Sequence, residues 1–226
     1  MPATFVMIPA AGDSAWSWHL VEAELRQRAH NVVAVELPED ESASLWDYAD
    51  TAVEAIGDRS TVVVVGHSFG GFTAPLVCAR AQVDMLVLVT AMIPSPGEPP
   101  ADWWANTGHE QARREQGGDG DDIATYYHDV RLELAAEAMK RVRNQPSNRA
   151  YSEPWPLAAW PAVPTRFLIC RDDRFFPADW MQGVVADRLG IVPDEMDSGH
   201  CPMLGHPAEL ARRLEAYAAE GRATPR

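Results

Sequence analysis

A serine between glycines follows directly on a run of four valines. Val62–Val65 leads into the segment Gly66–Gly71 (GHSFGG), and a helical pattern begins at Phe69. This is the G-x-S-x-G pattern in the strand-to-helix context that holds a serine hydroxyl above the edge of a sheet. Glycine at both flanking positions removes the Cβ atoms that would clash in so sharp a turn. The pattern predicts that Ser68 is a nucleophile.

A serine nucleophile needs a base to take its proton and a carboxylate to orient that base. After a strand–turn–helix elbow, the acid and then the histidine follow in chain order. Asp172 and Asp173 come shortly after the apolar run Thr165–Ile169, whereas the residues after Met85–Val89 include no acid up to Gly97. The acid is therefore expected at the later strand, and spacing alone does not separate the two aspartates.

Two histidines lie downstream of this acidic pair. His200 occupies a loop after the last predicted strand, and so the edge of the sheet where Ser68 is expected. His206 precedes Pro207, which is typical of the first turn of a helix, so His206 is expected at the surface. His67, inside the elbow, is expected to point away from the site. The pattern predicts His200 as the base.

Short, nearly continuous apolar runs alternate with helical patterns along most of the chain. Such runs are typical of parallel strands that are buried on both faces by crossover helices. The alternation predicts a single α/β domain over residues 1–226, with a six-stranded, mainly parallel sheet and helices on both faces. The expected strands are Thr4–Ile8, Val32–Val35, Val62–Val65, Met85–Val89, Thr165–Ile169 and Ile191–Met196, and the expected helices are Ser14–Arg28, Ser44–Ile56, Phe69–Ala81, Asp179–Leu189 and Pro207–Ala219.

The interval from about 94 to 161 breaks this alternation, because it holds helical patterns such as Asp129–Val142 and no strand pattern. We expect a small helical cap over the carboxyl ends of the strands, where open α/β sheets place their ligands. The alternative is a helical excursion whose aromatic residues form only its own core. In the cap interpretation, an apolar substrate pocket is lined by Trp103, Trp104 and Tyr126 from the cap and by Phe72, Phe176 and Met203 from the sheet domain.

With these motifs in place, the whole chain resembles the α/β-hydrolase superfamily, in particular its small-esterase branch of plant methylesterases and hydroxynitrile lyases. The resemblance rests on the elbow, on Arg171–Pro177, on Ser198–Leu204 and on Ala15–Trp18 (AWSW). It implies that Asp173 rather than Asp172 is the acid. It also implies that the backbone N–H groups of Ala11 and Phe69 form the oxyanion hole.

Two departures from the family pattern limit what the resemblance implies. The first loop opens with Pro9-Ala10 in place of His-Gly, which bears on the shape of the oxyanion loop. The family's lyases carry threonine in the first loop and lysine after the catalytic histidine, where this chain has Ala10 and Cys201. Elimination of cyanide is therefore disfavoured.

The amino-acid composition limits the classes of partner that we expect the protein to bind. A formal charge of −14, from 19 basic and 33 acidic residues, disfavours nucleic acid and, at long range, anionic substrates. The three cysteines are scattered, so they predict neither a disulfide framework nor a metal site. The sequence also shows no basic leader and no apolar stretch of membrane length, and together these features favour a cytoplasmic protein. The expected partners are a small-molecule substrate and, in a homodimer, a second copy of the chain, with no membrane partner.

The residues together predict hydrolysis of a small neutral ester through an acyl-enzyme, which needs no cofactor. One alternative is another activity on this scaffold, such as a thioesterase, lactonase or carbon–carbon bond hydrolase, because fold and triad do not fix the substrate. The other is a hydrolase-like receptor that binds a small molecule and turns it over slowly or not at all. Labelling by a fluorophosphonate probe separates an enzyme from a receptor.

Overall fold

The computed structural model describes residues 2–117, 120–143 and 146–223. A six-stranded sheet in the order β2-β1-β3-β4-β5-β6 forms its centre, and every neighbouring pair of strands is parallel. The predicted α/β fold with helices on both faces is confirmed. The strands are β1 (Thr4–Ile8), β2 (Asn31–Ala34), β3 (Val62–His67), β4 (Met85–Val89), β5 (Thr165–Cys170) and β6 (Asp194–Met196).

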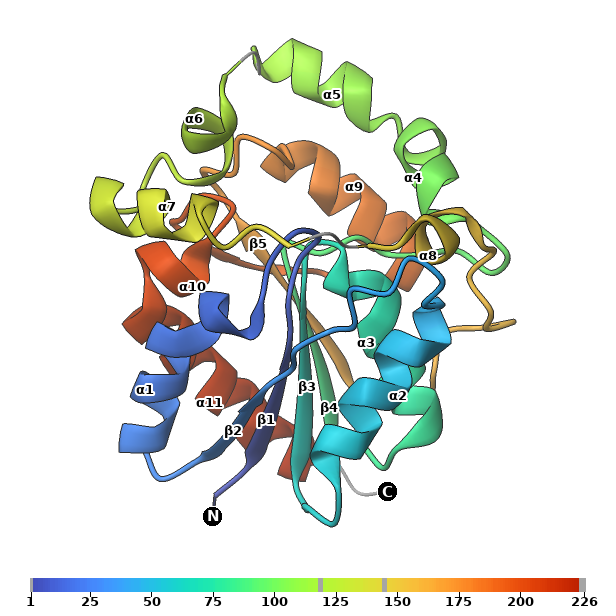
Figure 1. Cartoon of the computed structure of the whole chain (residues 1–226), viewed down its shortest axis with the longest axis vertical. Coiled ribbons are helices and arrows are strands. Elements are labelled where there is room, and N and C mark those ends of the chain that lie inside the picture. The colour runs from blue at the N-terminus through green and yellow to red at the C-terminus, as the bar shows by residue number, and fades with distance from the viewer. Residues whose placement is uncertain (1, 118–119, 144–145, 224–226) are drawn as a thin grey trace.

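Helices cover both faces of this sheet (Figure 1). On one face lie α1 (His19–Gln27), which follows a 3₁₀ turn at Ala15–Trp18, and α11 (Pro207–Ala223), with the short α10 (Pro202–Gly205) before it. On the other face lie α2 (Leu45–Ile56), α3 (Gly70–Arg80) and α9 (Ala178–Leu189). The side chains of β3 alternate between the two layers: Val62 and Val64 pack on the α2–α3 side, and Val63 and Val65 on the other. Burial on both faces explains why this strand reads as an uninterrupted apolar run.

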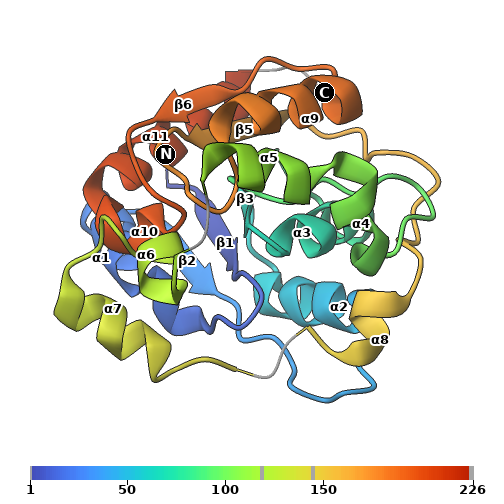
Figure 2. The ribbon, with the colours of Figure 1, turned by 90° about the horizontal axis from the view of Figure 1, so that it is seen from above.

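Five further helices lie between β4 and β5, in the interval where the sequence shows no strand pattern. They are α4 (Pro100–Thr107), α5 (His109–Gln116), α6 (Asp122–Tyr126), α7 (Leu132–Met139) and α8 (Asn148–Ser152). Seen from the side and from above, they lie over the edge of the sheet at which the strands end (Figures 1 and 2). The chain thus places a helical layer where the predicted nucleophile is expected.

The last strand and the helix expected after His128 are both shorter than predicted. The last strand is Asp194–Met196 rather than Ile191–Met196, because Pro193 has no N–H to donate to a ladder and Val192 is 89% exposed. The helix expected over Asp129–Val142 spans only Leu132–Met139. His128 and Asp129 therefore lie in a connection between α6 and α7 rather than in a helix.

Candidate active site

Ser68 occupies the turn between β3 and α3 with a φ of 49°, in the left-handed region that L-residues rarely adopt. Neighbouring segments leave no room for side chains on the adjacent glycines. A Cβ on Gly66 would lie 2.9 Å from that of Ala74, and a Cβ on Gly71 would lie 1.9 Å from the carbonyl oxygen of Met92. The backbone N–H of Met92 also donates to the Ser68 carbonyl at 2.9 Å. Packing therefore holds the strained serine in place.

His200 and Asp173 form a buried pair at the same edge of the sheet. Nδ1 of His200 lies 2.8 Å from Oδ2 of Asp173, and the two residues are 3% and 0% exposed. An ionised carboxylate only accepts hydrogen bonds, so Nδ1 carries the proton and Nε2 keeps its lone pair. Asp172 is exposed and contacts this region through its backbone, donating its N–H to the Ser198 carbonyl at 3.0 Å. Asp173 is therefore the carboxylate that orients the ring.

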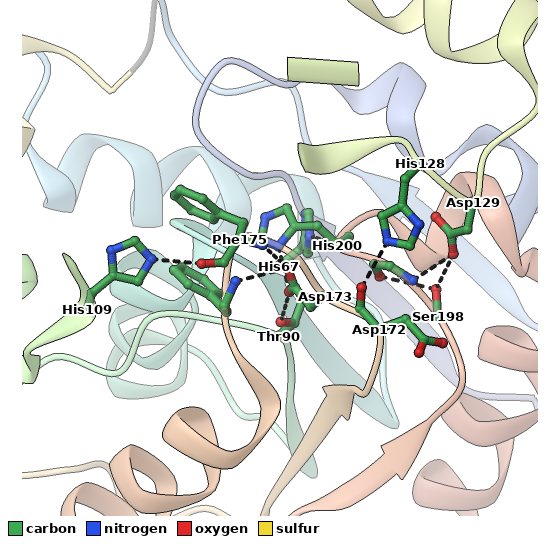
Figure 3. A network of polar contacts seen from close by, with 12 residues as sticks. His67, Thr90, His109, His128, Asp129, Asp172, Asp173, Phe175, Ser198 and His200 are labelled. Carbon is green, nitrogen blue, oxygen red and sulfur yellow. Dashed lines mark hydrogen bonds and ion pairs between the residues drawn. The ribbon is translucent and has the colours of Figure 1, made fainter. Parts of the chain in front are cut away.

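Three further donors surround the Asp173 carboxylate (Figure 3). The Thr90 hydroxyl donates to Oδ2 at 2.6 Å, and the N–H groups of Phe175 and Phe176 donate to Oδ1 at 2.8 and 2.9 Å. Burial alone would raise the pKa of Asp173, but the adjacent His200 and these hydrogen bonds hold that pKa below its ordinary value. Asp173 stays ionised although it is fully buried. The sequence prediction overlooked Thr90, whose only signal is a polar residue directly after a buried strand.

His67 does not point away from the site, contrary to the expectation from the elbow. Its Nε2 lies 2.8 Å from the carbonyl oxygen of His200, and the two rings are 4.9 Å apart. Burial, with a smaller contribution from the neighbouring His200, lowers the pKa of His67 to about 3. His67 is therefore neutral at pH 7 and donates from Nε2 to the backbone of His200, which supports the loop that carries the base.

A cavity of about 390 Å³ joins these groups to the helical layer. Ser68 and His200 both line it, and so do Ala11 and Phe69, whose N–H groups were expected to form the oxyanion hole. Phe69 precedes the first turn of α3, where unpaired N–H groups and the helix dipole favour negative charge. Despite its Pro9-Ala10 opening, the first loop forms a compact turn in which Asp13 N–H donates to the Ala10 carbonyl at 3.2 Å. The structure thus brings the predicted nucleophile, base and oxyanion donors to one cavity.

Two of the six predicted pocket residues, Trp104 and Tyr126, line this cavity. The prediction is wrong for the other four, which are buried behind the wall: Phe72, Trp103, Phe176 and Met203.

All four belong to the hydrophobic core on one face of the sheet or the other. The Trp103 indole N–H donates to the Ile93 carbonyl at 2.9 Å, and its ring packs against Phe176 and Trp180. The Phe176 ring centroid lies 5.3 Å from that of His200, so Phe176 backs the base rather than facing substrate. An abundance of aromatic residues did not indicate which of them point inward.

Most of the apolar wall comes from residues other than the six predicted for the pocket. They are Met92, Tyr127, Met139, Val142, Pro146, Tyr151 and Phe175. Phe175 is the neighbour of the buried Phe176, and its ring lies 4.9 Å from that of Tyr126 and 5.2 Å from that of His200. The wall therefore combines the loop after β5 with the helical layer.

Asp13 also lines the cavity and was missed. Burial raises its pKa to about 7, against the opposing effect of the nearby His200. Asp122 is a second carboxylate in the lining. The described lining residues include neither lysine nor arginine, so this wall offers no cation to an anionic substrate.

The described parts of the chain contain no cluster of three or more His, Cys, Asp or Glu residues that could hold a metal ion. None of the helices in the same ranges combines the length and apolarity needed to cross a membrane.

Comparison with known proteins identifies the family. The chain is 26% identical over 244 residues to Methylesterase 7 of Arabidopsis thaliana, covering 93% of this chain and 94% of that one. It is 25% identical over 248 residues to Norfluorocurarine synthase 2 of Strychnos nux-vomica, covering 93% of each. The crystal structure of polyneuridine aldehyde esterase superimposes with a TM-score of 0.79 at 20% identity, over 96% of this chain and 99% of that one. These likenesses confirm the resemblance to the small-esterase branch. Because residues 5–213 match the family model as well, the chain belongs to the alpha/beta hydrolase family.

Proposed function

We propose that this protein is a serine hydrolase that cleaves a small neutral ester through an acyl-enzyme on Ser68. The observation that carries the proposal is the buried 2.8 Å contact between His200 Nδ1 and Asp173, in a site where His200 and Ser68 line the same cavity. This arrangement fixes the imidazole tautomer whose Nε2 can take a proton from a serine hydroxyl. The relatives named as methylesterase and polyneuridine aldehyde esterase support the same class of reaction.

In the first half of the reaction, Ser68 Oγ attacks the ester carbonyl carbon while its proton moves to His200 Nε2. The imidazolium that forms is stabilised by Asp173, which remains ionised because four donors surround it. Collapse of the tetrahedral intermediate passes the proton from Nε2 to the leaving alkoxide. An alcohol departs and the acyl group stays on Ser68.

The oxyanion of each tetrahedral intermediate requires hydrogen-bond donors that are already in place. We assign this role to the backbone N–H groups of Ala11 and Phe69, because both residues line the same cavity as Ser68. In the second half of the reaction, His200 takes a proton from water, and the resulting attack on the acyl carbon releases the acid and restores Ser68.

The cavity supports a small, neutral and largely apolar substrate. Its volume of about 390 Å³ lies in the lower part of the range of small-molecule sites. Apolar side chains from α4, α6 and α7 face the catalytic groups, which supports a cap function for this layer. Asp122 and the net charge of −14 disfavour a carboxylate on the substrate. Ala10 and Cys201 stand where the family's lyases carry threonine and lysine, which disfavours the elimination of cyanide.

We also propose a cytoplasmic location. All three cysteines are free, and Cys170 and Cys201 are buried. Burial raises the pKa of both thiols well above the ordinary value, so they behave as small apolar residues. Unpaired cysteines are typical of a reducing compartment.

Hydrolysis of a panel of neutral methyl and ethyl esters by the wild type and by Ser68→Ala tests the proposed reaction. We expect turnover by the wild type and a loss on the order of 10³-fold or more in the variant. Carboxylate-bearing analogues of the same esters should be cleaved more slowly. Ester hydrolysis that survives in purified, folded Ser68→Ala would contradict the proposal.

A further inference from the structure

Two consecutive residues of the helical layer, His128 and Asp129, contact the two loops that carry Asp173 and His200 (Figure 3). They lie between α6 and α7, directly after Tyr126 and Tyr127, which face the cavity. His128 and Asp129 are not among the residues that line the cavity. Any effect that they have on the reaction must therefore act through the catalytic loops rather than through contact with substrate.

Asp129 binds the loop of the proposed base. Its Oδ2 accepts a 2.6 Å hydrogen bond from the Gly199 N–H and a 3.2 Å hydrogen bond from the Ser198 hydroxyl. Nε2 of His206 approaches the same oxygen at 3.3 Å. The Asp129 side chain is 17% exposed, so water competes little for these contacts. Because Gly199 directly precedes His200, its hydrogen bond restrains the backbone from which the imidazole projects.

His128 binds the other loop. Its Nε2 donates to the carbonyl oxygen of Asp172 at 2.9 Å, and Asp172 directly precedes Asp173. The two loops are also joined to each other, because the Asp172 N–H donates to the Ser198 carbonyl at 3.0 Å. Consecutive residues of the helical layer thus hold the residue before the acid and the residue before the base.

Steric contact reinforces the hydrogen bonds at Gly199. A Cβ placed on Gly199 would lie 2.6 Å from Asp129 Oδ1 and 2.7 Å from His128 Nε2. Real Cβ atoms do not approach other atoms so closely, so the His200 loop lies directly against both side chains. A loop that is hydrogen-bonded and packed on one side has a single preferred position relative to the sheet.

From this geometry we propose that Asp129 is a positioning residue for His200, assisted by His128. Through Gly199 and Ser198 it fixes the loop so that Nε2 of His200 meets the hydroxyl of Ser68. The inference rests on the proposed function, because it requires His200 to act as the base. It gives the helical layer a second role: besides covering the cavity, it helps to set the geometry of the proton transfer.

The test compares Asp129→Leu, which removes the acceptor at similar size, with Asp129→Asn, which keeps an acceptor oxygen. Glu137→Gln is the matched control, since it removes a carboxylate of α7 that pairs with Arg141 at the surface. Each rate is divided by the concentration of functional sites, titrated with a fluorophosphonate, so that partial unfolding does not count as lost turnover.

We expect Asp129→Leu to lower kcat on the order of 10-fold or more, because small misplacements of a catalytic group are costly. Its KM should change less than about twofold, since Asp129 does not face substrate. Asp129→Asn should retain most of the wild-type kcat, and Glu137→Gln should match the wild type. A merely structural role would lower the melting temperature without this separation of kcat from KM and without rescue by asparagine.

A kcat per functional site in Asp129→Leu equal to that of Glu137→Gln would overturn the inference. Should Asp129→Leu not fold, Asp129→Ala takes its place, because it also removes the acceptor of the Gly199 and Ser198 hydrogen bonds. A kcat per functional site equal to that of Glu137→Gln would equally overturn the inference. Neither result touches the proposed function, which fails if the wild type hydrolyses no ester, if wild-type Ser68 resists the probe or if Ser68→Ala still hydrolyses esters.

Discussion

The hydroxyl of Thr90 donates a 2.6 Å hydrogen bond to Oδ2 of Asp173, the same oxygen that faces Nδ1 of His200. Thr90 follows the last residue of β4 with a φ of 36°, and its own N–H donates to the Leu168 carbonyl of β5 at 2.8 Å. The chain thus turns sharply where β4 ends and aims a hydroxyl at a carboxylate in the loop after the neighbouring strand β5. Thr90 restrains the oxygen that orients the base.

Replacing Thr90 by valine, which has nearly the same shape, should lower kcat by roughly 10- to 100-fold, since hydrogen bonds to charged groups contribute about 1.5–3 kcal/mol. Thr90→Ser keeps the hydroxyl and should remain close to the wild type. Steady-state kinetics on a neutral ester measures both. Equal activities in the valine and serine variants would show that the hydroxyl does not help Asp173.

The two neighbouring aspartates should differ strongly in their effect. Asp173→Asn removes the group that fixes the His200 tautomer, so kcat should fall on the order of 10⁴-fold, as in other triads. Asp172 is exposed and reaches the site only through its backbone, so Asp172→Asn should stay within about threefold of the wild type. Comparable losses in the two variants would contradict the assignment of the acid.

The raised pKa of Asp13 predicts a pH-dependent contribution to stability. Burial raises this pKa from 3.8 in the unfolded chain to about 7 in the folded protein, so between these values only the folded state holds the proton. The contribution is fully present below about pH 4 and is lost as the pH rises through about 7.

Asp13→Asn keeps the side chain neutral at every pH. The free energy of unfolding of Asp13→Asn minus that of the wild type should therefore increase as the pH rises from 5 to 8, by on the order of 1 kcal/mol or more. Urea titrations of both proteins at the two pH values measure this gain. A constant difference between the proteins, or a gain toward low pH, would show that Asp13 is not held protonated by burial.

Neighbouring tryptophans of α4 allow the cavity to be separated from the core. Trp104 lines the cavity and donates from its indole N–H to the Tyr151 hydroxyl at 2.9 Å, whereas Trp103 is fully buried. Trp104→Ala should change the ratio of kcat/KM between short and long neutral esters with little loss of stability. Trp103→Ala should instead destabilise the protein by about 3–5 kcal/mol. An unchanged ester preference in Trp104→Ala would show that this wall does not contact substrate.

The sheet was predictable because a strand that is buried on both faces appears in the sequence as a short, continuous apolar run. The runs Thr4–Ile8 and Met85–Val89 match β1 and β4 residue for residue. The weakest prediction was the last strand, which lies at the edge of the sheet, where fewer apolar neighbours constrain the sequence. The start of the helix expected over Asp129–Val142 was also misjudged, because Asp129 lies outside the helix and accepts hydrogen bonds from the loop that carries His200.

Some residues of the candidate site could be predicted from sequence patterns, and others could not. Ser68, Asp173 and His200 follow β3, β5 and β6, and elbow spacing, chain order and family resemblance indicated them. Thr90 and Asp13 carry no local motif, since their importance comes from the tertiary contacts that surround them. The prediction placed Phe176 in the pocket, whereas Phe175 lines it, and this too depends on tertiary contacts. Adjacent residues of a loop point in different directions, and only the packing of that loop decides which one faces the cavity.

The central claim is that Ser68 is the activated nucleophile, and mass spectrometry after treatment with a fluorophosphonate tests it most directly. The wild type should gain one probe adduct, and peptide mapping should place it on Ser68. Ser68→Ala should gain none, and His200→Ala should react far more slowly, because the hydroxyl then lacks its base. An unmodified wild type, or an adduct on another residue with equal labelling of Ser68→Ala, would contradict the assignment of the nucleophile.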